Sequence, residues 1–303
     1  NFTQSSVDIT LGLGRLYGFS VRCLFETRDI TDISTMQEIS PAIAANTTVG
    51  TTATLTDSRG GVTKSYTVAK LADNKVWMTS NLDLPGGTTI TSNDSDVTAN
   101  FTLPTSATKN ADNNNLTDST QFADDNTAYV FNSGNNTNCG ASGQNIPCGS
   151  YYSYVAATAG TGVNVTGDGY NAPSSICPKG WSLPTSTTSN ANANTDNNWK
   201  TGDFYALTTA YGANLESSWW ENSAETGGNF YSNAGPGTTP GFLLAGRYYN
   251  STLSYSGAEG YYWSSTFGPS TNAYSLSLGP GYVNSANNYY RGHGWSVRCL
   301  AES

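Results

Sequence analysis

The sequence near the C-terminus reads Ala273-Tyr274-Ser275-Leu276-Ser277-Leu278-Gly279-Pro280-Gly281 and, after a polar interval, His293-Gly294-Trp295-Ser296-Val297-Arg298-Cys299-Leu300. The first run alternates polar and apolar residues with a period of two, which is typical of a strand with one buried face. A turn followed by a second short strand that ends at a cysteine indicates a hairpin. We therefore expect a terminal β-hairpin over residues 272–300.

The N-terminus contains a second copy of this pattern. It reads Val7-Asp8-Ile9-Thr10-Leu11-Gly12-Leu13-Gly14 and then Tyr17-Gly18-Phe19-Ser20-Val21-Arg22-Cys23-Leu24, so that Ser-Val-Arg-Cys-Leu is identical in the two copies. The C-terminal copy is expected to complete the sheet of the main domain, so the same sheet has no place for a second copy of the hairpin. We expect residues 1–34 to be an N-terminal β-hairpin extension with a linker, and residues 35–303 to be the main domain.

Such an extension would expose apolar side chains along an open strand edge, and edges of this kind pair with other chains. We expect it to be either the end of a preceding tandem repeat or a strand donated to the sheet of a neighbouring subunit. Both arrangements give head-to-tail contacts between copies of the chain, which propagate into a filament. The alternative is a leader without a partner that carries a free thiol. The predicted intersubunit residues are Val7, Ile9, Leu11, Leu13, Phe19 and Cys23.

Local patterns predict the first elements of the main domain. The capping-box spacing of Ser34-Thr35-Met36-Gln37-Glu38 predicts a short helix that stops near Pro41. Alternating residues around an Arg-Gly-Gly turn predict a hairpin of residues 53–59 and 66–71. A strand containing Val76-Trp77-Met78 should follow it.

The rest of the domain is predicted to contain little regular structure. Residues 151–157 have helical character, and Asp203 caps a helical pattern that ends at Gly212. The segments 88–143 and 185–198 are rich in Asn, Asp, Thr and Ser, so we expect long polar loops there.

The composition limits the classes of partner. Only 12% of the residues are charged, whereas Asn, Thr, Ser, Gly and Tyr are frequent, as in extracellular proteins. The net charge is -9 and the 13 Lys and Arg residues form no basic stripe, so nucleic acid is not an expected partner. No apolar stretch approaches the ~18 residues needed to cross a bilayer, and we expect no membrane insertion.

The chain contains five cysteines and a single histidine, which limits the catalytic and metal-binding sites that it can form. The cysteines lack the spacing of a zinc site, so we expect disulfides formed in an oxidising compartment, with one thiol left free or paired between chains. His293 lies between two glycines, and we expect neither enzyme activity nor a cofactor. The carboxylates are scattered and fit solvated or turn-forming acids better than a Ca²⁺ site, so no metal is expected. They include Asp57, Asp73, Asp83, Asp124, Asp125 and Asp168.

Four aromatic doublets are the stronger functional signal, because amphipathic rings near polar loops can stack on sugars or anchor a protein partner. Neighbouring residues on a strand point to opposite faces, so one ring of each doublet is expected in the core. The doublets are Trp219-Trp220, Tyr248-Tyr249, Tyr261-Tyr262 and Tyr289-Tyr290.

Five separated blocks occur together in one order and spacing. They are Thr54-Leu55-Thr56-Asp57-Ser58-Arg59, Val76-Trp77-Met78-Thr79-Ser80-Asn81-Leu82, Ile176-Cys177-Pro178-Lys179-Gly180-Trp181-Ser182-Leu183-Pro184-Thr185, Tyr262-Trp263-Ser264-Ser265-Thr266 and Gly294-Trp295-Ser296-Val297-Arg298-Cys299. On these blocks the chain resembles, over about residues 35–302, the Fibrobacter succinogenes major paralogous domain, a family of exported bacterial proteins.

The resemblance implies an α+β, C-type-lectin-like fold, distantly similar to the formylglycine-generating enzyme, with short helices, small twisted antiparallel sheets and long polar loops. It brings the segments of Cys177 and Cys299 together, so these cysteines should pair. Cys139 and Cys148 should close the loop between them. The enzyme relatives use reactive cysteines, whereas these look structural. Four tryptophans within the blocks are expected in the core: Trp77, Trp181, Trp263 and Trp295.

These observations predict a secreted bacterial protein of the cell surface, acting as an adhesin or as the repeating subunit of an extracellular fibre. The alternative is a free-standing lectin-like module that binds carbohydrate or protein, without Ca²⁺, through the turn 284–293. That turn resembles the variable binding surface of some proteins of this fold. The candidate ligand-binding residues are Asn284, Asn287, Asn288, Tyr289, Tyr290, Arg291 and His293.

Overall fold

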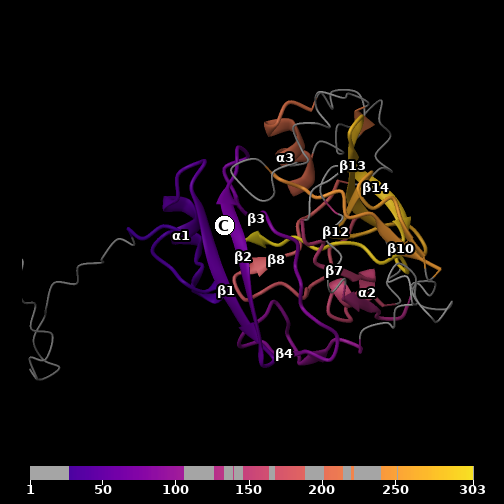
Figure 1. The fold of residues 1–303 in the computed structure, drawn as a ribbon, viewed down its shortest axis with the longest axis horizontal. Coiled ribbons are helices and arrows are strands. Elements are labelled where there is room, and N and C mark those ends of the chain that lie inside the picture. Colours follow the sequence, from indigo (N-terminus) through magenta and orange to yellow (C-terminus); the bar gives the residue numbers. More distant parts are fainter. Residues whose placement is uncertain are drawn as a thin grey trace, which may run out of the picture.

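The computed structural model describes residues 27–105, 126–132, 139, 146–163, 168–187, 201–213, 220–221, 240–250 and 252–302. These residues form small antiparallel sheets with few short helices, in line with the expected β-rich α+β class (Figure 1). The predicted intersubunit residues of the N-terminal extension lie outside the described residues. The same holds for Asp124, Asp125 and Trp219.

The first large sheet begins with the expected hairpin. Strands β1 (Thr52–Arg59) and β2 (Val62–Lys70) pair in an antiparallel register. Gly60 and Gly61 make the turn with φ of 56° and 79°. Glycine adopts this left-handed conformation readily because it has no Cβ.

The end of the chain completes this first sheet, whose strand order is β1-β2-β3-β15-β8. The C-terminal strand β15 (Leu300–Ala301) inserts between β3 (Val76–Met78) and β8 (Trp181–Ser182). Figure 1 shows the C-terminus beside the indigo N-terminal strands. Segments far apart in the sequence therefore share one sheet.

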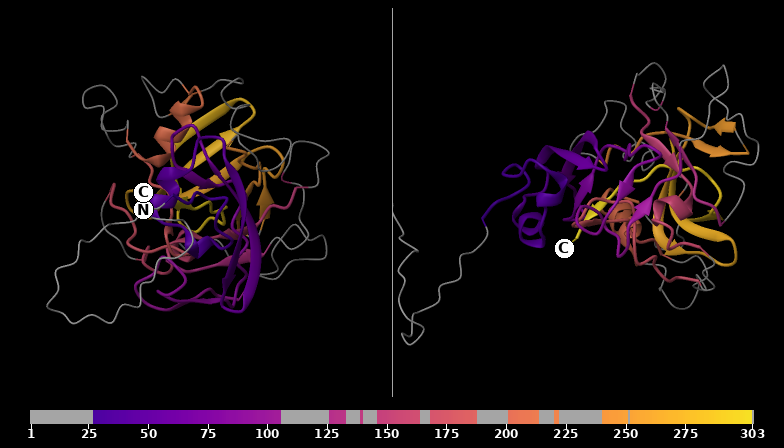
Figure 2. Two further views of the ribbon diagram at one scale, coloured as in Figure 1. Left: turned by 90° about the vertical axis from the view of Figure 1, so that its left-hand side faces the viewer. Right: turned by 90° about the horizontal axis from the view of Figure 1, so that it is seen from below.

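The second large sheet has the order β12-β13-β14-β9 and lies on the opposite side of the molecule from the β1–β2 hairpin (Figures 1 and 2). Its strands are β12 (Gly260–Phe267), β13 (Asn272–Gly279), β14 (Tyr282–Tyr290) and β9 (Trp220–Glu221). The predicted partner of β13 was wrong, because the chain turns at once through Pro280-Gly281 and returns as β14. Residues 284–290 are thus a strand, and residues 293–300 run into the first sheet.

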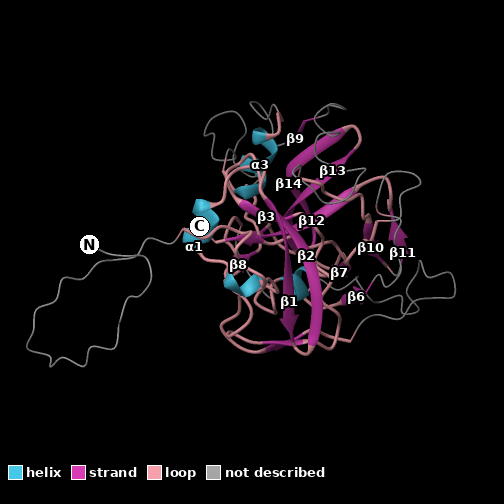
Figure 3. Cartoon of the chain, turned by 60° about the vertical axis from the view of Figure 1, so that its left-hand side comes forward, coloured by secondary structure: helices cyan, strands magenta, loops and turns pink. Residues whose placement is uncertain are grey.

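Three pairs of short strands and four short helical segments complete the described fold (Figure 3). The strand pairs are β4 (Thr89–Ile90) with β5 (Phe101–Thr102), β6 (Val130–Asn132) with β7 (Ser150–Tyr152), and β10 (Arg247–Tyr249) with β11 (Thr252–Ser254). The helical segments are the 3₁₀-helix η1 (Met36–Glu38), α1 (Pro41–Asn46), α2 (Tyr154–Ala157) and α3 (Asp203–Ala210).

The predicted short helix with its capping box is confirmed as η1, which ends at Glu38 before Pro41. Pro41 then starts a further helix that was not predicted, α1, at whose first position a missing N–H costs nothing. Residues 151–157 are only partly helical, since Tyr151 and Tyr152 belong to β7. The helix predicted before Gly212 is present as α3, with Phe204 buried on its inner face. The predicted cap was wrong, because Gly202 is the N-cap and the Asp203 carboxylate instead accepts from the Thr185 backbone N–H and pairs with Lys75.

Buried aromatic residues fill the core between the two large sheets. Trp77, Trp181, Trp263 and Trp295 are fully buried, as expected. Ile30 and Ile33, which the sequence analysis placed in the linker, are buried in the main cluster because their apolar side chains pack there. The structure contains the two expected disulfides, Cys139–Cys148 and Cys177–Cys299.

Candidate binding groove

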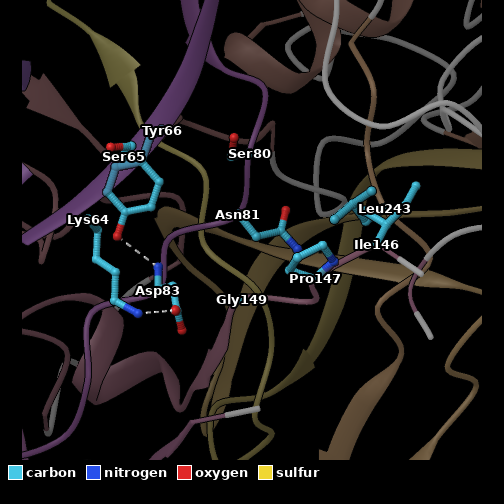
Figure 4. Close-up of a pocket in the computed structure, with 10 residues that line it drawn as sticks. All are labelled: Lys64, Ser65, Tyr66, Ser80, Asn81, Asp83, Ile146, Pro147, Gly149 and Leu243. Atoms are coloured by element: carbon cyan, nitrogen blue, oxygen red, sulfur yellow. Dashed lines mark hydrogen bonds and ion pairs between the residues drawn. The ribbon is translucent and has the colours of Figure 1, made fainter. Parts of the chain in front are cut away.

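A depression of about 230 Å³ lies beside the β1–β2 hairpin, and its polar groups are already engaged with one another. The Lys64 ammonium lies 2.5 Å from the carboxylate of Asp83. A dashed line in Figure 4 marks this ion pair. The backbone N–H of Asp83 donates to the Tyr66 hydroxyl, and Asn81 Oδ1 accepts from Arg298 Nε. This depression therefore offers a ligand few uncommitted partners.

A larger groove of about 380 Å³ lies on one face of the β12–β14 sheet. Each lining side chain carries a hydroxyl, amide, carboxylate or guanidinium group, and four of them are tyrosines. Three strands give one row of the lining, since Tyr261 pairs with Ser277 and Ser277 pairs with Asn284. Strand β10, bridged to β12 through Gly246 and Gly260, contributes Arg247 to the lining.

A bulge in β14 decides which of its residues face the groove. Ser275 and Ser277 are two positions apart on β13, but their partners Asn287 and Asn284 are three apart on β14. In a regular strand, residues three apart point to opposite faces. The extra residue of the bulge turns both asparagines to the same face. Tyr289 follows two positions later and lines the groove as well.

The asparagines keep hydrogen-bonding capacity toward the groove. Asn284 Oδ1 accepts from the backbone N–H of Ala286 at 3.0 Å, which leaves its amide nitrogen to donate elsewhere. Asn287 Nδ2 donates to Ser275 Oγ at 3.2 Å, which leaves its carbonyl oxygen to accept. The groove therefore presents a donor and an acceptor side by side.

Arg247 forms the positive end of the groove. Its guanidinium carbon lies 5.2 Å from the ring centre of Tyr255, 5.4 Å from that of Tyr261 and 5.0 Å from that of Tyr289. A cation over aromatic faces is attracted by their negative quadrupole. Three rings thus hold the charge in place at the groove wall.

Tryptophans form a rigid base beneath these rings. Trp295 stacks on Trp263 with ring centres 4.0 Å apart and on Tyr261 with centres 5.2 Å apart. The indole Nε1 of Trp263 donates to the carbonyl of Tyr152 at 2.8 Å. Because these rings are buried and interlocked, the groove is formed before any ligand arrives.

The negative end of the groove contains Glu259. Its carboxylate accepts a hydrogen bond from the Tyr261 hydroxyl. Burial, with the hydrogen bond and charge of Glu259 adding to it, raises the pKa of Tyr261 above its usual range. Burial, followed by the charge of Glu259, raises the pKa of Tyr282 to about 12. Both hydroxyls therefore stay protonated at neutral pH, and the Tyr261 proton is the one donated to Glu259.

The structure brings three of the seven predicted ligand-binding residues into the groove, namely Asn284, Asn287 and Tyr289. The other four do not line it. Asn288 pairs with Tyr274 and points to the face of the sheet away from the groove. Tyr290, at the end of β14, is 50% exposed and lies outside the groove lining. Arg291 and His293 are buried, and the Arg291 guanidinium donates to the backbone carbonyls of Gly162 and Ser270.

His293 lies within an aromatic cage rather than in an exposed turn. Its ring stacks on Tyr249 with centres 4.2 Å apart and meets the edges of Tyr289 and Trp295. Only 1% of the residue is exposed. Burial, with the nearby charge of Arg247 adding to it, lowers the pKa of His293 to about 3. The imidazole is therefore neutral at physiological pH.

This depressed pKa makes the folded protein sensitive to acid. The unfolded chain carries a histidine with an ordinary pKa, so between about pH 6.5 and pH 3 the unfolded state binds a proton that the folded state does not. The associated stability is complete above that window and is lost as the pH falls through it. We expect a His293→Phe variant, which keeps the ring stack, to escape this loss.

Urea denaturation of both proteins at pH 7, 5.5 and 4 measures the effect. Between pH 7 and pH 4 the unmodified protein should lose about 3 kcal/mol more unfolding free energy than the variant does. Burial raises the pKa of Asp96 to about 6, so its protonation makes the folded state more stable as the pH falls. This effect is the same in both proteins and cancels in the comparison. Parallel pH profiles for the two proteins would contradict the assignment.

Sequence reasoning missed Arg247, Tyr255 and Glu259, which come from β10 and the segment after β11. A usable signal was present, because Arg247 directly precedes the Tyr248-Tyr249 doublet in a chain with only 13 Lys and Arg residues. The rule of one core ring per doublet is confirmed for Tyr248-Tyr249 but is wrong for Tyr261 and Tyr262. Both are buried because β12 is covered on both faces.

Within the described part of the chain, no group of three or more His, Cys, Asp or Glu side chains is arranged to hold a metal ion. Among the same residues, no helix is both long and apolar enough to cross a membrane. Comparisons with protein-family models, with curated proteins and with solved structures give no match.

Proposed function

We propose that this protein is an extracellular carbohydrate-binding module of the adhesin type, and that the groove on the β12–β14 sheet is its binding site. The observation that supports this most is the side-chain set of the groove, in which four tyrosine rings are combined with two asparagines, a guanidinium and a carboxylate. A sugar has apolar C–H faces and a rim of hydroxyl groups. Tyrosine rings suit the faces, and the amide and charged groups suit the hydroxyls.

The groove is better suited to a saccharide than to a protein partner. Among the described residues no aliphatic side chain lines it, whereas the fully buried centre of a protein interface is usually apolar. Its volume of about 380 Å³ falls within the range of small-molecule sites. A catalytic role is not part of the proposal, since the single histidine is enclosed by rings and lies outside the lining.

Titration with a panel of soluble oligosaccharides tests this function. Tyr255 is 48% exposed at the groove, so a Tyr255→Ala variant should fold normally and bind about tenfold more weakly, through loss of ring contact. Tyr170→Ala is the matched control, because Tyr170 is a tyrosine with 70% exposure that does not line the groove. The proposal fails if no saccharide binds, or if the two variants bind as the unmodified protein does.

We propose a C-type-lectin-like fold of the major paralogous type, supported by where the five sequence blocks fall. They lie in β1, β3, β8 and β12 and in the segment that leads into β15. Assembly of the adhesin into a fibre through residues 1–26 stays a prediction, because that segment lies outside the described residues.

A further inference from the structure

Arg247 differs from the other buried or half-buried arginines in what its guanidinium contacts. Arg59 is bound to Asp57, Arg291 to two backbone carbonyls, and Arg298 to Asn81 and the carbonyls of residues 240 and 241. Arg247 forms no ion pair with a carboxylate of the described residues. It faces a groove instead of the protein interior. Its charge is therefore positioned but not neutralised.

The three tyrosine rings explain why this charge is tolerated there. Cation–π contacts offset part of the lost hydration, and a side-chain hydrogen bond to Tyr289 uses only part of the guanidinium's five N–H donors. A planar fork of donors matches the two oxygens of a carboxylate. A lysine, or an arginine free to rotate in solvent, would select less strongly for the two-oxygen geometry of a carboxylate. Arg247 is thus prepared for an anionic group that comes from outside the chain.

Glu259 restricts what else the ligand can carry. Its carboxylate accepts from Tyr261 and has further lone pairs for donors. A ligand that was anionic along its whole length would be repelled here, whereas hydroxyl groups would bind. The groove therefore fits a molecule with one carboxylate and several hydroxyls on a compact ring.

We infer that the groove selects an acidic saccharide of the hexuronate type, with the sugar carboxylate on the Arg247 guanidinium, sugar hydroxyls on Glu259 and Asn284, and the ring against Tyr255. This rests on the proposed function, since it names the saccharide class that the same site takes. The juxtaposition that supports it is a half-buried arginine that has no carboxylate partner among the described residues, less than 6 Å from three ring centres, in a groove that also contains a glutamate.

The test uses calorimetric titration with three trisaccharides that differ at one sugar only: a galactose trimer in which one residue is galacturonate, the methyl ester of that galacturonate, and the neutral galactose trimer. We expect the acid to bind about 10- to 100-fold more tightly than the ester or the neutral trimer, as a charge-assisted bidentate pair allows. Arg247→Met, which keeps most of the apolar stem, should reduce the affinity for the acid to that for the neutral trimer. It should weaken binding of the neutral trimer much less than binding of the acid. Arg247→Lys should recover only part of the preference.

Lys179→Met is the matched control, since it removes one positive charge from an exposed residue outside the groove and should change no affinity. Thermal unfolding of each variant checks that it is folded. Equal affinities for acid and ester in the unmodified protein, or an equal loss for acid and neutral trimer in Arg247→Met, would overturn the inference while leaving carbohydrate binding intact. Absence of binding to all three probes, together with failure of the wider saccharide panel, would instead remove the proposed function.

Discussion

Replacing Asp57 by alanine is expected to lower the unfolding free energy by about 3 to 5 kcal/mol. Arg59 is 0% exposed, and its guanidinium contacts both oxygens of Asp57 as well as Ser95 Oγ and the carbonyl of Ile176. Removal of the carboxylate leaves this cation buried without a counter-charge. The cost is large because water cannot reach the guanidinium to replace the lost partner.

A double-mutant cycle separates this pair from simple loss of packing. Urea denaturation of Asp57→Ala, Arg59→Met and the double variant should show the double variant less destabilised than the sum of the singles, by about 1 to 3 kcal/mol. Lys64→Met is the control, since it breaks an ion pair on the same hairpin whose side chains are about one third exposed. That change should cost under about 1 kcal/mol. Additive single losses would show that the charges are not coupled.

Asp57 also shows why sequence patterns misjudge buried charge. The sequence favoured a solvated or turn-forming acid at this position, and the structure places it inside strand β1. Leu55, Asp57 and Arg59 share the inward face because they are two residues apart. Alternation identifies the faces of a strand, but it does not say that opposite charges two positions apart will satisfy each other in the core. The partners from other segments, Gln37 and Ser95, appear only in three dimensions.

The parts of the fold that the sequence predicted well depend on local signals. The β1–β2 hairpin follows from Gly60-Gly61, and α3 follows from the spacing of Phe204 and Leu207 before Gly212. Strand β14 was missed for an equally local reason. Its bulge breaks the period of two, and its asparagines are typical of turns rather than strands.

The candidate site was only partly predictable for the same reason. Asn284, Asn287 and Tyr289 were selected as members of a polar turn, and they reach the groove because a bulged strand turns them to one face. Arg247 and Glu259 lie 25 to 42 residues earlier in the chain than these three residues, and only the packing of β10 beside β12 brings them to this strand. A pattern within one segment contains no information about that approach.

The Cys177–Cys299 disulfide should contribute most to the stability of this architecture. Its cysteines are 122 residues apart in the sequence, and the bond ties the segment before β8 to the segment before β15. A crosslink restricts the unfolded chain more strongly as the closed loop lengthens. By this loop-entropy estimate, the Cys177→Ala/Cys299→Ala variant should lose about 5 kcal/mol of unfolding free energy.

The matched control is the Cys139→Ala/Cys148→Ala variant, whose cysteines are 9 residues apart. The same estimate gives a loss of about 2.5 kcal/mol for this shorter loop. Both pairs are fully buried, so the cost of removing the sulfur atoms is similar and the difference between the variants reports on loop length. Urea denaturation without reductant measures both losses. Equal losses would mean that local packing, rather than the restriction of the unfolded chain, determines what these bonds contribute, and that the end of the chain is held in the first sheet mainly by its strand pairing.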